Sequence, residues 1–301
     1  DYKSNGDISD LQITLKDRFK SNFIENPIKK ISISKTNLEI NLNRKKNNLL
    51  NLNGIYNLGG TENKRFKISH NIDKKKPKYF IDFNLAENIF LEILNFKSNN
   101  QNGSNIKSEI SFVNDNIIFN NIKFIENKNS IFIKDLKLNS KKNLVSISGI
   151  EVLTFNGKEQ NNNFKISFKE KIFVTGSKYD ATYLLEQIAN DSKINPLKNY
   201  TKNINIKLDS LITKSKIPLK NFNLIGRINK GKFEKLSAKS EFSKNEFLDI
   251  SLVKDDNNNK KLEIYSDMPQ ALLSSYKFFE GIKGGKLLYN LVFDDEESAS
   301  K

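Results

Sequence analysis

The chain has 301 residues with no cysteine and a single histidine, which excludes disulfide bonds, cysteine-ligated metals and any metal site built from several histidines. Its hydrophobic fraction of 37% is low for a globular chain, so we expect a thin structure with much exposed surface. The formal net charge of +15 favours anionic partners, although a solvated surface in a chain rich in lysine and asparagine is the simpler interpretation.

Strand patterns dominate the chain from its beginning. Apolar and polar residues alternate with a period of two, which places the apolar side chains of each segment on one face of a strand. Strands with one apolar face are typical of an antiparallel sheet that is covered on one side only. The segments with this alternation are 12–16, 31–34, 38–42, 66–69, 131–138, 145–148, 164–168 and 204–208.

Three helices are predicted between these strands. The first, near 85–96, begins after Asn84, which Glu87 complements as in a capping box. The second and third, near 180–190 and 268–279, begin at the N-cap candidates Asp180 and Asp267. A strand precedes each helix, so the sequence predicts one recurring strand-and-helix unit, and Gly284 with Gly285 forms a turn after the third.

These elements predict a mainly β protein, in which repeated strand units form an extended, strongly twisted antiparallel sheet and an open groove, with three short helices. We expect a first set of units over residues 1–190 and a second over 191–301, joined in one elongated structure. A closed barrel or sandwich with a dry core is the alternative that the strand patterns leave open.

No constellation of residues indicates an enzyme, a cofactor site or a metal site. The alternation within 66–72 is interpreted as placing His70 on a polar strand face, without a partner for catalysis. No phosphate-binding glycine motif is present, and basic residues between aromatic ones follow from one-faced strands, so we do not expect nucleic-acid binding.

Several short motifs resemble the AsmA-like family, and most closely its large YhdP and TamB types. The segments GSKYDATYLL at 176–185 and SDMPQALL at 266–273 are similar to the family's helix entry, in which an aspartate is followed by leucines. The segment IKGGKL at 282–287 looks like its next strand start, and NGDISDLQITL at 5–15 like its repeated strand starts. Pro269 and Gln270 stand where small residues are usual in the family.

The resemblance implies a segment of a longer, bridge-like lipid-transfer protein of the Gram-negative envelope. Such proteins are anchored in the inner membrane through an N-terminal segment and cross the periplasm, and outer-membrane components are further partners. Phospholipid acyl chains would lie in an apolar groove, where burial stabilises each CH₂ by about 0.8 kcal/mol. A structural or interaction module of the envelope without lipid cargo is the alternative.

The residues expected on the groove face are the apolar members of the alternating segments. They are Ile13, Leu15, Ile31, Ile33, Leu38, Ile40, Leu42, Ile131, Ile133, Ile204, Ile206 and Leu208.

Overall fold

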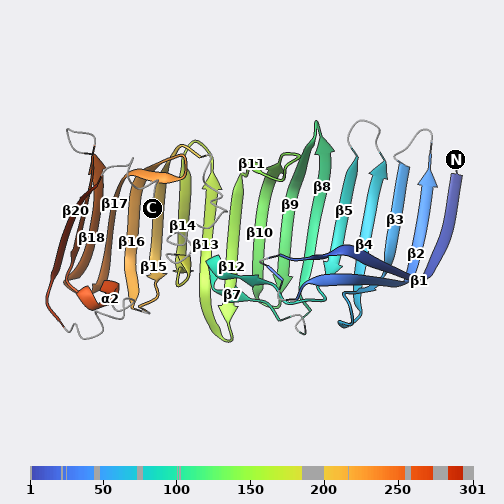
Figure 1. Cartoon of the computed structure of the whole chain (residues 1–301), viewed down its shortest axis with the longest axis horizontal. Helices are drawn as coiled ribbons and strands as arrows, with labels where there is room; N and C mark the ends of the chain where they lie inside the picture. The colour runs from blue at the N-terminus through green and yellow to red at the C-terminus, as the bar shows by residue number, and fades with distance from the viewer. Residues whose placement is uncertain are drawn as a thin grey trace. The chain divides into compact units, whose positions relative to one another are not determined.

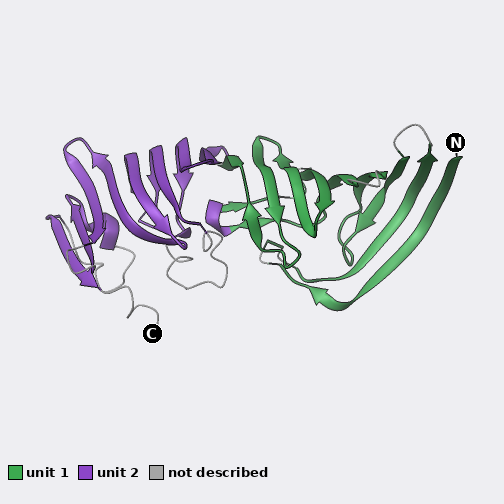
Figure 2. Ribbon diagram, turned by 90° about the horizontal axis from the view of Figure 1, so that it is seen from above, with its two compact units in different colours: residues 1–91, 96–155 green, residues 92–95, 156–301 purple. Residues whose placement is uncertain are grey.

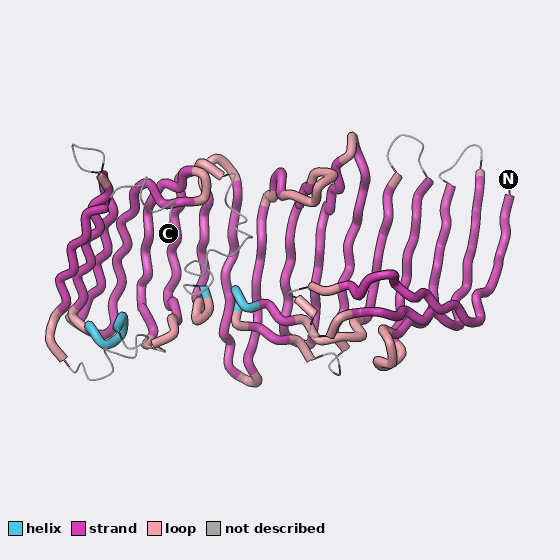
Figure 3. The backbone as a smooth tube through the Cα atoms, viewed as in Figure 1, coloured by secondary structure: helices cyan, strands magenta, loops and turns pink. Residues whose placement is uncertain are grey.

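The computed structural model describes residues 2–21, 23–24, 26–43, 48–72, 77–99, 101, 103–184, 200–215, 217–254, 259–273 and 284–293. Over this part of the chain the protein is built mainly of β-strands, as Figures 1 and 3 show. Eighteen of the twenty strands are joined in one hydrogen-bonded sheet, and β6 and β7 form a second. The predicted β class is therefore confirmed.

The chain divides into two compact units, coloured separately in Figure 2. Unit 1 comprises residues 1–91 and 96–155, and unit 2 comprises residues 92–95 and 156–301. The boundary predicted near residue 190 lies outside the described residues.

Unit 1 is an antiparallel meander. Its strands pair in the order β1-β2-β3-β4-β5-β8-β9-β10-β12, and β11 pairs with the end of β10. Tight turns join several neighbours: Asn114 and Asp115 both have positive φ, as hairpin turns that match the strand twist require. The strands are β1 (Tyr2–Phe19), β2 (Ile28–Leu42), β3 (Asn48–Asn57), β4 (Lys64–Ile72), β5 (Lys78–Asn84), β8 (Asn105–Val113), β9 (Asn116–Glu126), β10 (Asn129–Leu138), β11 (Leu144–Ser146) and β12 (Gly149–Asn156).

The hairpin of β1 and β2 bends across the neighbouring strands of unit 1. At Lys35 the backbone has a positive φ of 46°, and the register of β2 against β3 shifts between Ser34 and Asn37. Beyond this bulge the hairpin crosses in front of β3 to β5 (Figures 1 and 2). Its tip reaches the segment after β5, where Ile24 forms an isolated bridge with Ile89.

The prediction of a helix near 85–96 is wrong. The segment folds as β6 (Phe90–Leu91), a single 3₁₀ turn η1 (Glu92–Leu94) and β7 (Phe96–Lys97). A closed loop forms in place of a helix because Ile89 and Ser98 are joined by two hydrogen bonds. Ser98 N donates to Ile89 O at 2.8 Å, and Ile89 N donates to Ser98 Oγ at 2.7 Å. This closure leaves Phe96 and Leu94 only 1% and 8% exposed, so these two apolar residues are buried without a helical repeat, whereas Ile93 stays 44% exposed.

Unit 2 is a second meander with one parallel pair. Its strands follow chain order, and among the strand pairs described β14 and β15 alone run parallel. The sheet is therefore mixed rather than purely antiparallel as predicted. Because these two strands run parallel, β15 starts at the same end of the sheet as β14, with Ile172 beside Ile204. The elements are β13 (Glu159–Phe168), β14 (Ile172–Asp180), β15 (Lys202–Ile212), β16 (Pro218–Asn229), β17 (Lys232–Ser243), β18 (Glu246–Lys254), β19 (Lys260–Ser266), α2 (Pro269–Leu273) and β20 (Leu287–Phe293).

The other two predicted helices fall partly outside the described residues. Of 180–190, the described part is the end of β14 at Asp180, a turn at 182–183 and Leu184, which has helical backbone hydrogen bonding. Of 268–279, the helix α2 covers Pro269–Leu273, and Pro269 occupies its first position, where a missing N–H costs no hydrogen bond.

Candidate functional site

An apolar face runs from strand to strand through unit 1. Residues paired across neighbouring strands point to the same side of a sheet, so the register identifies each row of side chains. A row of partners crosses eight strands and contains one polar residue, a serine. It consists of Leu38, Leu52, Ile68, Ile81, Ser108, Ile122, Ile133 and Ile150.

The row beside it points to the opposite face and is mostly polar or charged. Its members are Asn37, Asn53, Lys67, Asp82, Lys107, Lys123, Phe132 and Glu151. We call this opposite side the outer face. Ion pairs between strands lie on it: Lys107 Nζ is 2.9 Å from Asp82 Oδ2, and Lys134 Nζ is 2.6 Å from Glu151 Oε1. The two faces of unit 1 therefore differ sharply in polarity.

Unit 2 has the same two-faced construction. Its apolar row is Ile166, Val174, Ile206, Leu224, Ala238, Ile250, Ile264 and Tyr289. The adjacent outer row is Lys165, Thr175, Lys207, Asn223, Lys239, Asp249, Tyr265 and Leu288. We call the side with the apolar row the inner face of each unit.

The groove residues predicted from the sequence differ widely in burial. Ile131, Ile204 and Leu208 are buried, whereas Ile13 and Leu42 keep 39% and 37% of their surface exposed. The remaining seven are half-buried: Leu15, Ile31, Ile33, Leu38, Ile40, Ile133 and Ile206. The inner face thus contains both buried apolar side chains and apolar side chains that solvent still reaches.

Part of the inner face of unit 1 is covered by the β1–β2 hairpin. Tyr56, Phe66 and Ala86 form a buried cluster, against which Ile33 of the hairpin and Phe83 pack. The rings of Tyr56 and Phe83 meet edge to face, 5.5 Å apart. Burial raises the pKa of Tyr56, and its hydroxyl donates to Asn84 O at 2.8 Å.

The prediction for His70 is wrong. His70 has the same parity as Phe66 and Ile68 and therefore lies on the inner face, across from Tyr79. Its ring stacks on that of Tyr79, with centroids 4.0 Å apart and planes 9° apart. Counting the alternation from Phe66 would have given the correct face, and the stacking pair is an aromatic part of the inner face.

The two aspartates predicted to cap helices have different surroundings. Asp180 is buried, and its Oδ1 accepts from the backbone N–H and hydroxyl of Thr182, as a capping residue does. Its Oδ2 accepts from Asn95 Nδ2 at 2.8 Å, while Asn162 bonds both Asp180 N and Leu94 O. These buried hydrogen bonds hold the turn Glu92–Asn95 within unit 2. The sequence pattern did not indicate this role.

Asp267 does not cap α2 through its side chain. Oδ2 accepts from Phe247 N at 3.0 Å, and Oδ1 accepts from Tyr265 Oη at 2.5 Å and from Lys286 Nζ at 2.9 Å. These hydrogen bonds, that of Tyr265 first, lower the pKa of Asp267 to about 2. Asp267 thus joins the end of β19 to β18 and to the segment before β20. That segment contains Gly284 and Gly285, both of which have a positive φ.

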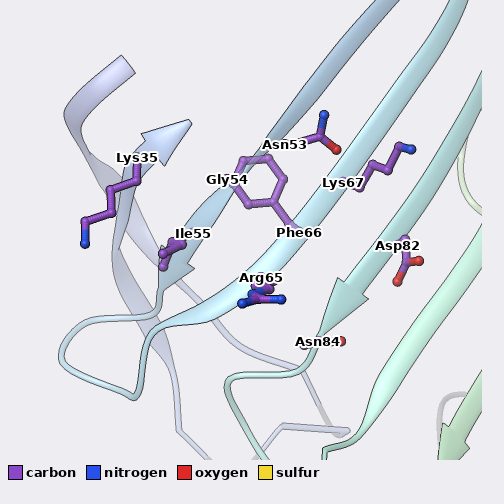
Figure 4. Close-up of a pocket in the computed structure, with 9 residues that line it drawn as sticks. All are labelled: Lys35, Asn53, Gly54, Ile55, Arg65, Phe66, Lys67, Asp82 and Asn84. Carbon is purple, nitrogen blue, oxygen red and sulfur yellow. The ribbon is translucent and has the colours of Figure 1, made fainter. Parts of the chain in front are cut away.

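A basic pocket of about 450 Å³ opens on the outer face of unit 1 (Figure 4). The cations are Lys35, Arg65 and Lys67, and the one carboxylate, Asp82, is already engaged by Lys107 and by Asn105 Nδ2 at 2.6 Å. The pocket has the charge to hold an anion, but it offers no nucleophile beside a general base. It lies on the face opposite to the apolar row.

Chemistry of other kinds has little support in the described part of the chain. No cluster of three or more histidine or acidic residues there could hold a metal ion. Among the helices described, none has the length and apolar content needed to cross a membrane. No family model, curated protein or solved structure matches the chain.

Proposed function

We propose that the inner faces bind the acyl chains of phospholipids and that the protein belongs to a lipid-conducting structure of a cell envelope. The observation that carries the proposal is the apolar row of each unit, which crosses strand after strand. Most of its side chains are half-buried, and in unit 2 Val174, Leu224 and Ala238 are buried. The row beside it, on the opposite face, is mostly polar or charged, so the apolar row offers a continuous surface on which apolar ligands gain by leaving water.

The energetics favour a chain-like ligand over a compact one. Each CH₂ laid on the apolar row contributes about 0.8 kcal/mol, and neighbouring strands about 4.8 Å apart offer sites of similar chemistry. A ligand can then shift from one strand to the next without a large change in free energy. Movement along the face needs no reaction, so we propose a carrier rather than an enzyme.

The envelope location and the inner-membrane anchor rest on the resemblance to AsmA-like proteins and remain predictions. The same holds for the outer-membrane partners. The net charge of +15 is compatible with anionic headgroups that project from the apolar face into water.

A structural module without lipid cargo is the second candidate. The β1–β2 hairpin already covers the cluster of Tyr56 and Phe66, so the chain itself shields part of the inner face from solvent. If the protein covered the rest in the same way, no apolar strip would remain for a ligand.

Lipid extraction and native mass spectrometry of the purified protein distinguish the two. We expect co-purifying phospholipid that is lost in the double variant Ile133→Asp, Ile206→Asp, since both side chains are half-buried members of the apolar rows. The matched control is Phe132→Asp, Asn205→Asp, which adds the same charges to the outer face one residue away and should retain lipid. A folded wild-type protein that carries no lipid and takes none from vesicles contradicts the proposal.

A further inference from the structure

The last strand of unit 2, β20, has an unusual edge. It pairs with β19 on one side, and no described residue pairs with its other side. Its apolar side chains are exposed on both faces: Leu288 and Val292 on the outer face keep 71% and 56% of their surface, and Tyr289 and Leu291 on the inner face keep 44% and 40%. A strand edge of this kind is a template for pairing with another strand.

The sequence of β20 lacks the usual protection of an edge. Native edge strands are blocked by charges, proline or bulges, yet Leu287–Phe293 contains neither a charged residue nor proline, and its register with β19 is regular. The contrast is with β1. Among the described strands it pairs with β2 alone, and it carries Lys3, Asp7, Asp10, Lys16, Asp17 and Arg18. The two edges are thus built differently, and that of β20 has none of the charges that disfavour pairing on β1.

The strand is also complementary to itself. In an antiparallel pair of two copies centred on Asn290, Leu287 faces Phe293, Leu288 faces Val292 and Tyr289 faces Leu291 of the second copy. Every apolar residue then meets an apolar residue, and Asn290 meets its own equivalent, where two amides can bond each other.

We propose that two copies of the chain associate through antiparallel pairing of β20 with β20. The symmetry is a twofold axis at Asn290 perpendicular to the sheet, which makes the interface isologous. Such an axis keeps the inner faces of both copies on the same side, so the apolar row of unit 2 continues into the second copy. The pairing itself does not depend on lipid binding.

Light scattering during size-exclusion chromatography, over a range of protein concentrations, tests the association. We expect a dimer for the wild type and a monomer for the double variant Leu288→Lys, Val292→Lys, because each new lysine would face another across the pair. Both positions are exposed, so the fold should tolerate the change. Ile225→Lys, Val253→Lys adds the same charge at exposed positions of the outer face away from the edge and should stay dimeric.

Cysteine cross-linking tests the register, and the chain offers a clean background because it contains no cysteine. Asn290→Cys places two thiols opposite each other, within about 4.5–5.5 Å between Cα atoms, and should form a disulfide-linked dimer under mild oxidation. Leu288→Cys is more exposed but lies four residues away from its equivalent, so it should link poorly. A monomeric wild type, or equal linking of the two variants, overturns the proposal, whatever the lipid content.

Discussion

Gly54 shows how closely single residues fit on the inner face of unit 1. A Cβ atom added at Gly54 would lie 1.9 Å from Thr36 Oγ1 and 3.0 Å from a carbon of the Phe66 ring. Thr36 is 2% exposed because it occupies the space that glycine leaves open. The bulge of β2 can therefore pack against β3 because Gly54 has no side chain there.

Gly54→Ala should therefore destabilise the protein by about 1–3 kcal/mol through overpacking, as measured by chemical denaturation. Gly6→Ala is the matched control, since no atom lies within 4 Å of the added Cβ, and it should change stability by less than about 0.5 kcal/mol. Equal effects of the two substitutions would show that the hairpin does not pack as described.

Asp267 makes stability depend on pH. Its pKa is about 2 in the folded protein, where Tyr265 and Lys286 bond the carboxylate, against about 3.9 in an unfolded chain. A lowered pKa means that the stabilisation is complete above pH 3.9 and is lost as the pH falls toward 2. Between pH 5 and pH 2 the denaturation midpoint should fall more steeply for the wild type than for Asp267→Asn, and parallel curves would contradict this assignment.

At the scale of elements, the bulge at Lys35 keeps the apolar residues of β2 on one face. The sequence alternates on odd positions up to Ile33 and on even positions from Leu38, and the extra residue absorbs this change of phase. Without it, one half of β2 would turn its apolar residues to the outer face. The change of phase is visible in the sequence, although the bend that follows from it is not.

Lys35 occupies the left-handed region, with a φ of 46°. Lys35→Val should cost about 1–2 kcal/mol of stability, since a β-branched residue is strained there, whereas Lys35→Gly should be neutral or slightly stabilising. Lys30→Val, at an exposed position of the regular part of β2, serves as the control and should have little effect on the thermal midpoint. A tolerated valine at both positions would count against the bulge.

Other elements show where sequence patterns are insufficient. The residues at 85–96 fit a helical repeat, but bonds between Ile89 and Ser98 and the burial of Phe96 close a loop, and such tertiary contacts override local propensity. The parallel pair of β14 and β15 was also missed, because each strand has the same alternation in either direction. Alternation alone therefore does not determine the direction in which two neighbouring strands run.

At the scale of the molecule, periodicity alone predicted the β class and the one-faced strands. The burial of individual positions was not predictable, because Ile204 and Ile206 have the same pattern, yet the first is buried and the second half-buried. The pairing of strands decides this, since it determines which neighbours cover each side chain. For the same reason, the sequence did not indicate the hairpin that covers Tyr56 and Phe66.

The central claim is that lipid lies on the inner face, and photo-cross-linking tests it most directly. A photoreactive phenylalanine analogue is placed at Ile206 in one protein and at Asn205, on the outer face, in another, and each is irradiated with vesicles of phosphatidylethanolamine and phosphatidylglycerol. We predict that phospholipid becomes attached at position 206 and not at position 205. Equal attachment at both positions, or none at 206 in a folded protein, would contradict the account.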